Sequence, residues 1–417
     1  MDQSRTYQSL RKAMTRFTAD YVAPTDFQPM LFGTELEILV KFTNAPIFDV
    51  QIHERYNQVA EYLSQQLTLA GIRHYKHESG QPADYTQWAL TTDGSIPQDH
   101  AGGVFGFELV SPIQQNTRWP AWLDNYETMY LSLRQHFTLV DEKLCGTHVH
   151  VSPLSAHGWF DHFEALKRVA KAVIYFERCV DSLMPLNRLK VHYCRSNRYN
   201  PIFRGRSIQS VLEMIDSTGD PTALAHLMCS DGNDGSSHRY YRWNFTRLTD
   251  ASVVDPIDPS DAAYTNSPKC HHAEHHQDPY ANQRKGTIEF RQPPGSLSFA
   301  QAEEWSQFAV GFVVGAMACV TSDHESAVDM TRPADLNALQ RILRVGVQAG
   351  QVDVGNLLAH IFDEKAQLPN GPFEKTEIDP AELPRLKAKR PVDDANDERF
   401  FLASFDGLLE DIDDAAA

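Results

Sequence analysis

The chain has 417 residues, of which 42% are hydrophobic and 22% charged, so its composition is that of an ordinary globular protein with a sizeable core. The length allows one large domain or two to three smaller ones. Its formal net charge of −17 argues against a nucleic-acid-binding protein, whose affinity rests on neutralising phosphates.

The expected compartment follows from the cysteines and the N-terminus. Six cysteines are spread through the chain without a Cys-x-x-Cys pair, which favours free thiols in a reducing compartment. Met1–Arg5 leads into a polar stretch without an apolar signal core, and the longest nearly uncharged run, 308–320, is too short to span a bilayer. We expect a cytoplasmic protein with small-molecule substrates and neither a nucleic-acid nor a membrane partner.

The chain predicts an α+β protein in which strands and helices alternate. An N-terminal helical segment (1–30) precedes the first strand candidate, and the catalytic domain is expected over 31–320. Strand candidates lie at 31–42, 86–92, 105–111, 145–152, 240–246 and 286–292, and helices are expected at 53–70, 119–139, 159–184, 207–215 and 302–320. Residues 255–283 have the composition of a long surface loop. Residues 321–417 predict a helical C-terminal section with helices at 335–349 and 354–362, a flexible stretch at 366–398 and an acidic tail at 410–414. We expect a mostly antiparallel sheet with helices packed on one face.

Glu35 and Glu37 share one face of the first strand, because residues two apart in a strand point the same way. Leu36 and Ile38 point to the other face, into a core. An isolated Glu-x-Glu pair is most often a solvent-exposed strand face, but the apolar flanks here favour burial. Buried neighbouring carboxylates need a compensating cation, and oxygen ligands favour Mg²⁺ or Mn²⁺.

Three further strands carry polar side chains on one face. Read singly, each has an ordinary interpretation, because a His-x-His pair is more often structural and a Glu-x-Arg pair is a weak ion pair. In one sheet they would together form a metal site with a guanidinium suited to phosphate. The residues are Glu108, His148, His150, Glu289 and Arg291.

Missing motifs narrow the chemistry. The chain has no P-loop, no dinucleotide-binding glycine motif, no nucleophile elbow and no His-Glu-x-x-His helix. The run Cys270–His276 has zinc-ligand side chains, but no second set with structural-zinc spacing accompanies it. It belongs to the predicted 255–283 loop, for which metal binding and a role as an active-site lid are both open.

The order of the motifs is similar to the metal and ATP face of glutamine synthetase and glutamate–cysteine ligase. That order is Glu-x-Glu, a later Glu, Gly-x-His-x-His-x-Ser and Glu-x-Arg. The segments FGTELEILV, WALTTDGSI, FGFELVSP, CGTHVHVSP and GTIEFRQPPGS more closely resemble the amidoligase family of fungi and bacteria, over about residues 31–300.

The resemblance implies a curved antiparallel sheet that holds ATP and two or three Mg²⁺ ions, with Mn²⁺ as an alternative. Glutamine synthetase has a further Glu pair where this chain has only Glu108, which leaves the number of ions open. By position, the implied metal ligands are Glu35, Glu37, Glu108, His148 and Glu289. The implied catalytic residues are Glu289, His150 and Arg291, the last two facing phosphates. Nucleotide or substrate contacts are expected at Trp88, Asp93 and Ser95, which match the family's second strand and turn. Arg195, Arg198 and Asn244 lie between the motifs, where the basic and aromatic content suits substrate-carboxylate or adenine contacts or, equally, a structural role.

The expected function is an ATP- and Mg²⁺-dependent carboxylate–amine ligase that works through an acyl phosphate. Its substrates would be a small-molecule or peptide carboxylate and an amine. Two alternatives stay open at this point: a phosphotransferase resembling guanidine kinases, which the same sheet could support, and a metal-dependent hydrolase that needs no ATP.

Overall fold

A computed structural model describes most of the chain between residues 29 and 349. The described residues are 29–42, 52–77, 83–93, 95–142, 144–190, 192–203, 205–232, 237–249, 286–319, 328, 330 and 334–349. Several expectations lie outside them: the helical segment before residue 29, the 255–283 loop with Cys270–His276, the 354–362 helix, the 366–398 stretch and the acidic tail.

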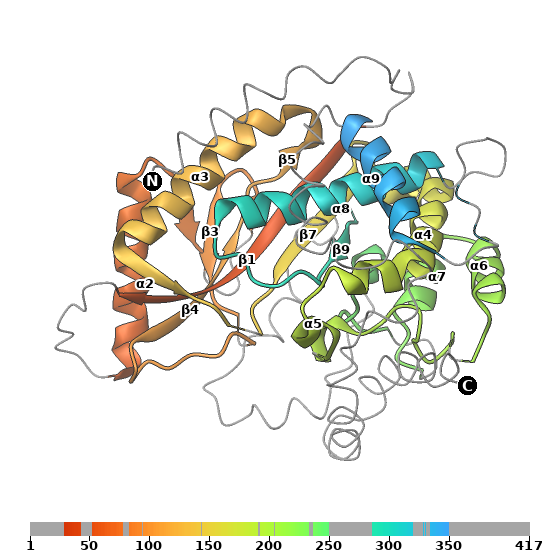
Figure 1. Ribbon diagram of the computed structural model, residues 1–417. Coiled ribbons are helices and arrows are strands. Elements are labelled where there is room, and N and C mark those ends of the chain that lie inside the picture. The colour runs from red at the N-terminus through yellow and green to blue at the C-terminus, as the bar shows by residue number, and fades with distance from the viewer. Residues whose placement is uncertain are drawn as a thin grey trace, which may run out of the picture.

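A nine-stranded, mostly antiparallel sheet forms the centre of the structure (Figure 1). Its strand order is β2-β3-β4-β1-β7-β9-β8, and β5 and β6 also pair with β1. Only β2 and β3 pair in parallel among the described strands. The strands are β1 Met30–Phe42, β2 His74–Lys76, β3 Trp88–Thr91, β4 Val104–Val110, β5 Gln114–Gln115, β6 Phe137–Val140, β7 Thr147–Pro153, β8 Trp243–Asn244 and β9 Ile288–Phe290. The expected mostly antiparallel sheet is confirmed.

The helices follow the apolar periodicity of the sequence, with several differences. The short helix α5 Leu186–Lys190 was not predicted, and the expected 159–184 helix consists of the 3-10 turn η3 Gly158–His162 and helix α4 Phe163–Ser182. The 119–139 helix ends at His136, because 137–140 pairs with β1 as strand β6 instead. A helix that the sequence did not predict, α7, begins where the Asp220 side chain accepts from Ala223 N at 2.7 Å. The helices are α2 Ile52–Leu69, α3 Trp119–His136, α4 Phe163–Ser182, α5 Leu186–Lys190, α6 Ile208–Asp216, α7 Pro221–Met228, α8 Phe299–Cys319 and α9 Leu336–Ala349, with short 3-10 turns η2 Asn116–Arg118, η3 Gly158–His162, η4 His192–Cys194 and η5 Thr246–Leu248.

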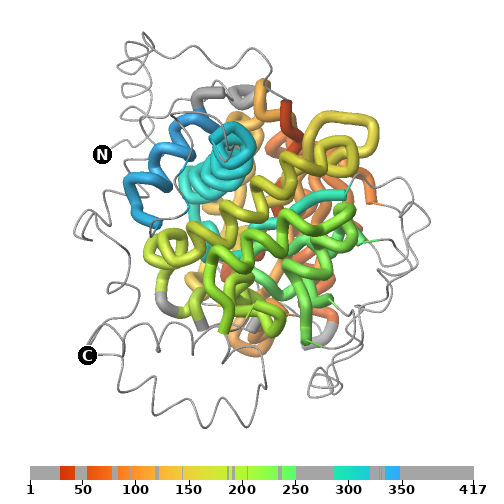
Figure 2. The backbone as a smooth tube through the Cα atoms, turned by 90° about the vertical axis from the view of Figure 1, so that its right-hand side faces the viewer, coloured from red at the N-terminus to blue at the C-terminus, as the bar shows by residue number. Residues whose placement is uncertain are grey.

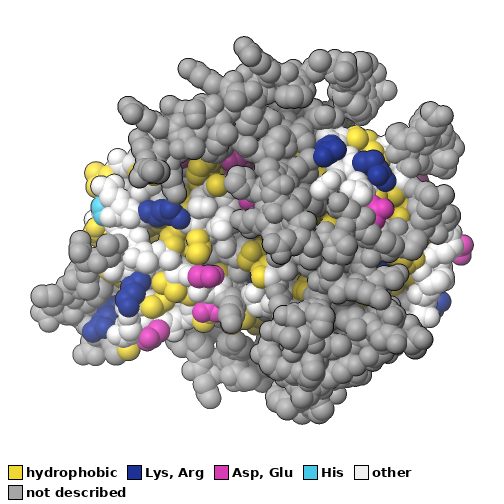
Figure 3. All heavy atoms as spheres, viewed as in Figure 1, with side chains coloured by type: hydrophobic (Ala, Val, Ile, Leu, Met, Phe, Trp, Pro, Cys, Tyr) yellow, Lys and Arg dark blue, Asp and Glu magenta, His cyan; other side chains and the backbone are white. Residues whose placement is uncertain are grey.

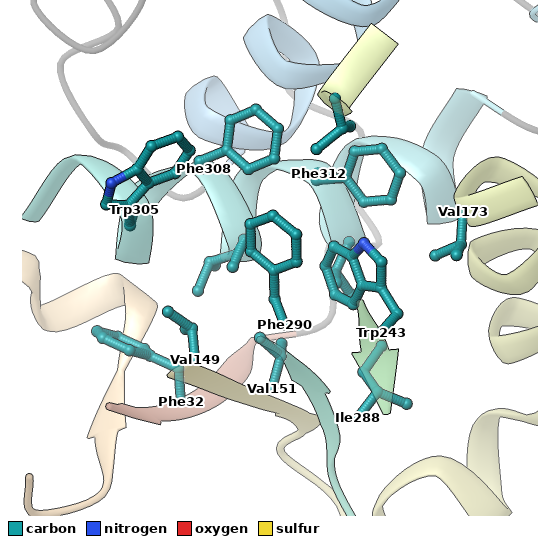
Figure 4. Packing of buried hydrophobic residues seen from close by; sticks show 14 of the residues in the cluster. Phe32, Val149, Val151, Val173, Trp243, Ile288, Phe290, Trp305, Phe308 and Phe312 are labelled. Carbon is teal, nitrogen blue, oxygen red and sulfur yellow. The ribbon is translucent and has the colours of Figure 1, made fainter. Parts of the chain in front are cut away.

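One face of the sheet packs against helices and forms the core. Figure 4 shows strand residues such as Val149, Val151 and Phe290 pointing towards Phe308 and Phe312 of α8. On the same face α3 packs against β1 and β3, since Trp122 contacts Phe32 and Tyr126 contacts Trp88. The opposite, polar face is left for the site described below.

Helices α4 to α7 and α9 are grouped at one end of the molecule (Figure 2), whereas α2 lies at the other end, beside α3 and β2 (Figure 1). Helix α4 contacts α6, α7 and α8, and α9 packs closely along α8. Gly311 and Gly346 allow that approach, because a Cβ on Gly346 would lie 1.8 Å from the Gly311 carbonyl oxygen.

The visible described surface in Figure 3 carries charged side chains singly, among apolar and neutral ones. Within the part of the chain that the structure describes, no helix is both long and apolar enough to cross a bilayer.

Candidate active site

The strand register brings the acidic and imidazole side chains together on the polar face of the sheet. Residues paired in register share a face, and the pairs are Glu37 with Glu108, Glu35 with His148, and His150 with Glu289. Asn244 of β8 pairs with Glu289 and extends the row. Asp93 follows β3 and adds a further carboxylate. One row of polar groups therefore runs across six neighbouring strands, β3, β4, β1, β7, β9 and β8.

Three overlapping groups of side chains along this row have the spacing of metal ligands. Within each group, one ligand atom per residue lies within 4.8 Å of the others. The groups are Glu35–His150–Glu289, Glu35–Glu108–His148 and Glu37–Asp93–Glu108. Because Glu35 and Glu108 each belong to two groups, neighbouring ions could share them as bridging ligands.

The two imidazoles lie between carboxylates from different strands. His148 Nδ1 is 3.4 Å from Glu35 Oε2 and 3.5 Å from Glu289 Oε1, and its Nε2 is 3.6 Å from Glu37 Oε1. His150 Nε2 is 3.0 Å from Glu35 Oε1 and 3.7 Å from Glu289 Oε1, and it is buried without a hydrogen bond among the described residues. A buried polar nitrogen that faces two carboxylates without a hydrogen bond fits a common cation between them.

The ligand side chains are held in place by donors around them. The Gly146 amide donates to Glu37 Oε2 at 2.5 Å, and Asn244 Nδ2 donates to Glu289 Oε2 at 2.8 Å. Position 146 leaves no room for a side chain, because a Cβ there would lie 2.8 Å from His148 Nε2. Arg291 Nη1 donates to Glu289 Oε1 at 2.5 Å.

The electrostatics differ between the two ends of the row. Burial would raise the pKa of Glu289, but Arg291 and His150 outweigh burial and lower it to about 2. Burial would also raise the pKa of Glu35, but His150 and His148 outweigh it and hold this pKa well below its usual value. At the other end, burial and the neighbouring Glu35 and Asp93 raise the pKa of Glu108 well above its usual value. At that end the described carboxylates outnumber the cationic side chains that act on them.

Burial also raises the pKa of Glu37, the third member of this acidic end. The Ser95 backbone N–H and hydroxyl both donate to Asp93 Oδ1 at 2.6 Å, so Ser95 orients a carboxylate of the row.

Most of the residues expected from the sequence come together here. These are Glu35, Glu37, Asp93, Glu108, His148, His150, Asn244, Glu289 and Arg291. Trp88 does not: it is buried on the core face, with its ring 4.9 Å from that of Tyr126, so it is turned away from any ligand on the polar face.

Arg195 and Arg198 lie along the segment between α5 and α6. The Arg195 amide donates to Tyr240 O at 2.7 Å, and the guanidinium lies 5.9 Å from the Tyr240 ring. The Arg198 amide donates to Glu177 Oε2 at 3.2 Å, and its guanidinium lies 5.4 Å from the neighbouring Tyr199 ring. These contacts tie both residues to the surrounding protein.

Two arginines near the site were missed by sequence reasoning. Arg247, in η5, has Nη2 4.0 Å from Glu35 Oε1. Arg188 is 2% exposed and donates to the Arg291 and Gln292 carbonyl oxygens at 2.8 and 2.9 Å, which fixes the backbone after β9. Neither belongs to a strand motif, and their only sequence signal is a basic residue next to an expected element.

Comparison with known proteins supports the resemblance that the motifs indicated. The family described as "Putative amidoligase enzyme" matches residues 28–256, more than half of the chain. The match contains strands β1 to β8 and every ligand of the three groups except Glu289, which lies on β9 beyond it. No curated protein matches the chain. The chain belongs to the amidoligase family.

Proposed function

We propose that this protein is an ATP- and Mg²⁺-dependent ligase that joins a carboxylate to an amine through an acyl phosphate. The observation that carries the proposal is the row of three overlapping ligand groups, in which the Arg291 guanidinium is hydrogen-bonded to Glu289. Family membership supports ligase chemistry in general. The row adds the two features that acyl phosphate formation needs, a site for hard divalent cations and a fixed guanidinium for a transferred phosphoryl group.

The residues fit divalent metal ions in donor type and in charge. Carboxylate and imidazole donors suit Mg²⁺ or Mn²⁺. Five carboxylates converge in the three groups, and the Glu37–Asp93–Glu108 end has no neighbouring imidazole in its group. The buried His150 Nε2 points at two carboxylate oxygens without a hydrogen bond. When bound, the ions would neutralise the phosphate charge of ATP.

The protein's own groups have defined tasks in this reaction. A carboxylate oxygen of the acid attacks the γ-phosphorus, and the bond to the ADP oxygen breaks. Arg291 would neutralise the charge on the transferred phosphoryl group, and Glu289 holds its guanidinium at 2.5 Å so that it need not reorient. The amine then attacks the acyl carbon, a C–N bond replaces the C–O bond, and phosphate and a proton leave.

The fold proposal is the glutamine synthetase-like arrangement. It is supported by a mostly antiparallel sheet that has helices on one face and the ligand row on the other. Since no P-loop was found in the sequence, we propose that the polar face of the sheet itself holds ATP.

An isotope experiment tests the mechanism directly. Purified protein is incubated with ATP, Mg²⁺, a set of ¹⁸O-labelled carboxylic acids and a set of amines. A ligase that uses an acyl phosphate transfers one ¹⁸O from the acid to inorganic phosphate and forms an amide. A phosphotransferase forms ADP and a phosphorylated product without inorganic phosphate, and a hydrolase acts without ATP. Either of these outcomes would contradict the proposal.

Variants connect the reaction to the site. Glu289→Gln and Arg291→Ala should lower ATP-dependent phosphate release by about 10²- to 10³-fold, the usual effect of losing one preorganised charge-stabilising group. The control is Glu213→Gln, because Glu213 lies exposed on α6. Circular dichroism establishes that each variant is folded. Near-normal turnover in a folded Glu289 or Arg291 variant would refute the assignment.

A further inference from the structure

Arg247 occupies the open side of the ligand row. Its side chain is 41% exposed, and Glu35 beside it is 19% exposed, whereas Glu37 and Glu289 are 4% and 1% exposed. Among these four side chains Arg247 is the most exposed, so a molecule that approaches Glu35 from solvent meets its guanidinium.

The backbone of Arg247 is fixed although its side chain is exposed. Thr246, before it, donates to Asn244 Oδ1 through its amide at 2.9 Å and its hydroxyl at 2.7 Å. Leu248, after it, is buried, and its carbonyl oxygen accepts from Thr222 Oγ1 at 3.2 Å. Asn244 in turn donates to Glu289, so the turn that carries Arg247 is tied to the ligand row.

The two arginines of the site differ in how firmly their guanidinium groups are held. Arg291 is 11% exposed, and it donates to Glu289 at 2.5 Å. Arg247 reaches Glu35 Oε1 only at 4.0 Å and makes no side-chain hydrogen bond with any described residue. Among the described residues, its donors are therefore not used by another side chain or carbonyl group, while those of Arg291 are partly used by Glu289.

The same 4.0 Å separation makes Arg247 and a metal ion competitors for Glu35. Without an ion, the guanidinium is attracted by the Glu35 carboxylate 4.0 Å away. An ion bound in the Glu35–His150–Glu289 group would take up the Glu35 charge and repel Arg247. Metal binding thus frees the guanidinium for an anion that also contacts the ion.

We propose that Arg247 binds the terminal phosphate of the nucleotide and that metal occupancy at Glu35 switches it from the carboxylate to this phosphate. The inference rests on the proposed function for the identity of the anion. It predicts that metal and phosphate bind with positive coupling, and that Arg247 has opposite effects on the two ligands.

The test measures binding rather than turnover. The affinities of Mn²⁺ alone, and of ADP and a non-hydrolysable ATP analogue with Mn²⁺, are compared by calorimetry for the natural protein and Arg247→Ala. Arg206→Ala is the control, because Arg206 is an exposed arginine before α6. We expect Arg247→Ala to weaken the ATP analogue about 10- to 100-fold, the range for charge-assisted hydrogen bonds, and to leave ADP unchanged. Mn²⁺ alone should bind about two- to fivefold more tightly, because a competing exposed cation is removed.

Each other result overturns the inference. Equal losses for ADP and the ATP analogue would place Arg247 away from the terminal phosphate. An unchanged affinity for the ATP analogue would assign the guanidinium to another anion or to none. Weaker binding of Mn²⁺ would mean a structural role. A different result would refute the proposed function alone. In that case the natural protein would bind the ATP analogue more tightly than Arg247→Ala does, but it would transfer no ¹⁸O from the acid to inorganic phosphate.

Discussion

Glu108 offers the sharpest test that the carboxylate row is a metal site. Its carboxylate belongs to two of the three ligand groups, yet none of the described residues forms a hydrogen bond or ion pair with it. Two ionised carboxylates whose oxygens lie within 4.8 Å of each other repel by at least about 3.5 kcal/mol at an effective dielectric constant of about 20. Burial, together with the neighbouring Glu35 and Asp93, raises the pKa of Glu108, which favours the protonated carboxyl group in the metal-free protein. Glu108→Gln copies the protonated form, so the metal-free variant should be as stable as the natural protein to within about 1 kcal/mol.

The effect of metal should be very different. A cation present at 100 times its dissociation constant stabilises the natural protein by about 2.7 kcal/mol, which raises Tm by about 5–10 °C for a domain of this size. If the loss of Glu108 weakens binding about 100-fold, the same metal concentration gives only about 0.4 kcal/mol, or about 1 °C.

The assay is thermal unfolding of both proteins and of Glu213→Gln, with and without Mg²⁺ or Mn²⁺. An equal Tm rise in the Glu108 variant and the natural protein would refute the assignment of Glu108 as a ligand. A metal-free variant that is several kcal/mol less stable would refute the claim that its carboxylate has only a binding role.

Three further predictions concern the support of the site and the core. Gly146→Ala should lower metal affinity about 10- to 100-fold, because the added Cβ would displace His148. The control in this calorimetric measurement is Gly219→Ala, where no atom lies within 4 Å of the added Cβ. Equal metal affinities of the two variants would contradict the prediction. The pKa of Asp181 is raised to about 7, mainly by burial. Between about pH 4 and pH 7 the folded protein therefore keeps a proton that the unfolded chain releases, so the free energy of unfolding should fall as the pH rises through this range. Asp181→Asn should flatten that slope in urea unfolding, and an unchanged slope would show that another group causes it. Phe290→Ala should cost about 3–5 kcal/mol in the same assay, since Phe290 is fully buried, and a loss below 1 kcal/mol would mean that the core closes around the gap.

The polar face of the sheet was predictable because side-chain alternation is a local property. Glu35 and Glu37 must point away from Leu36 wherever the strand is placed, and the same holds for His148 and Glu289. The sequence also contained the apolar partners that direct these faces away from the core. A mostly antiparallel sheet with helices packed on it could therefore be expected from single segments and their order.

The pairing of the strands was not predictable in the same way. Whether Glu108 lies opposite Glu37 depends on register, which is decided by contacts between segments far apart in the chain. Segment 137–140 continued the apolar pattern of a helix, but pairing with β1 makes it a strand. Trp88 falls in a motif that resembles the family, yet strand alternation turns its ring into the core. Arg247 could be found only from the turn that places it beside Glu35.

The position of β9 has a consequence for how the chain folds during synthesis. This strand lies between β7 and β8, although it follows both in the sequence, and Glu289 on it comes 45 positions after its partner Asn244. Until β9 is added, the edge of β7 that carries Val149 and Val151 lacks this partner, and such an edge can pair with other chains. The nascent protein therefore passes through a stage that is open to aggregation, and the candidate ligand group Glu35–His150–Glu289 is incomplete during that stage.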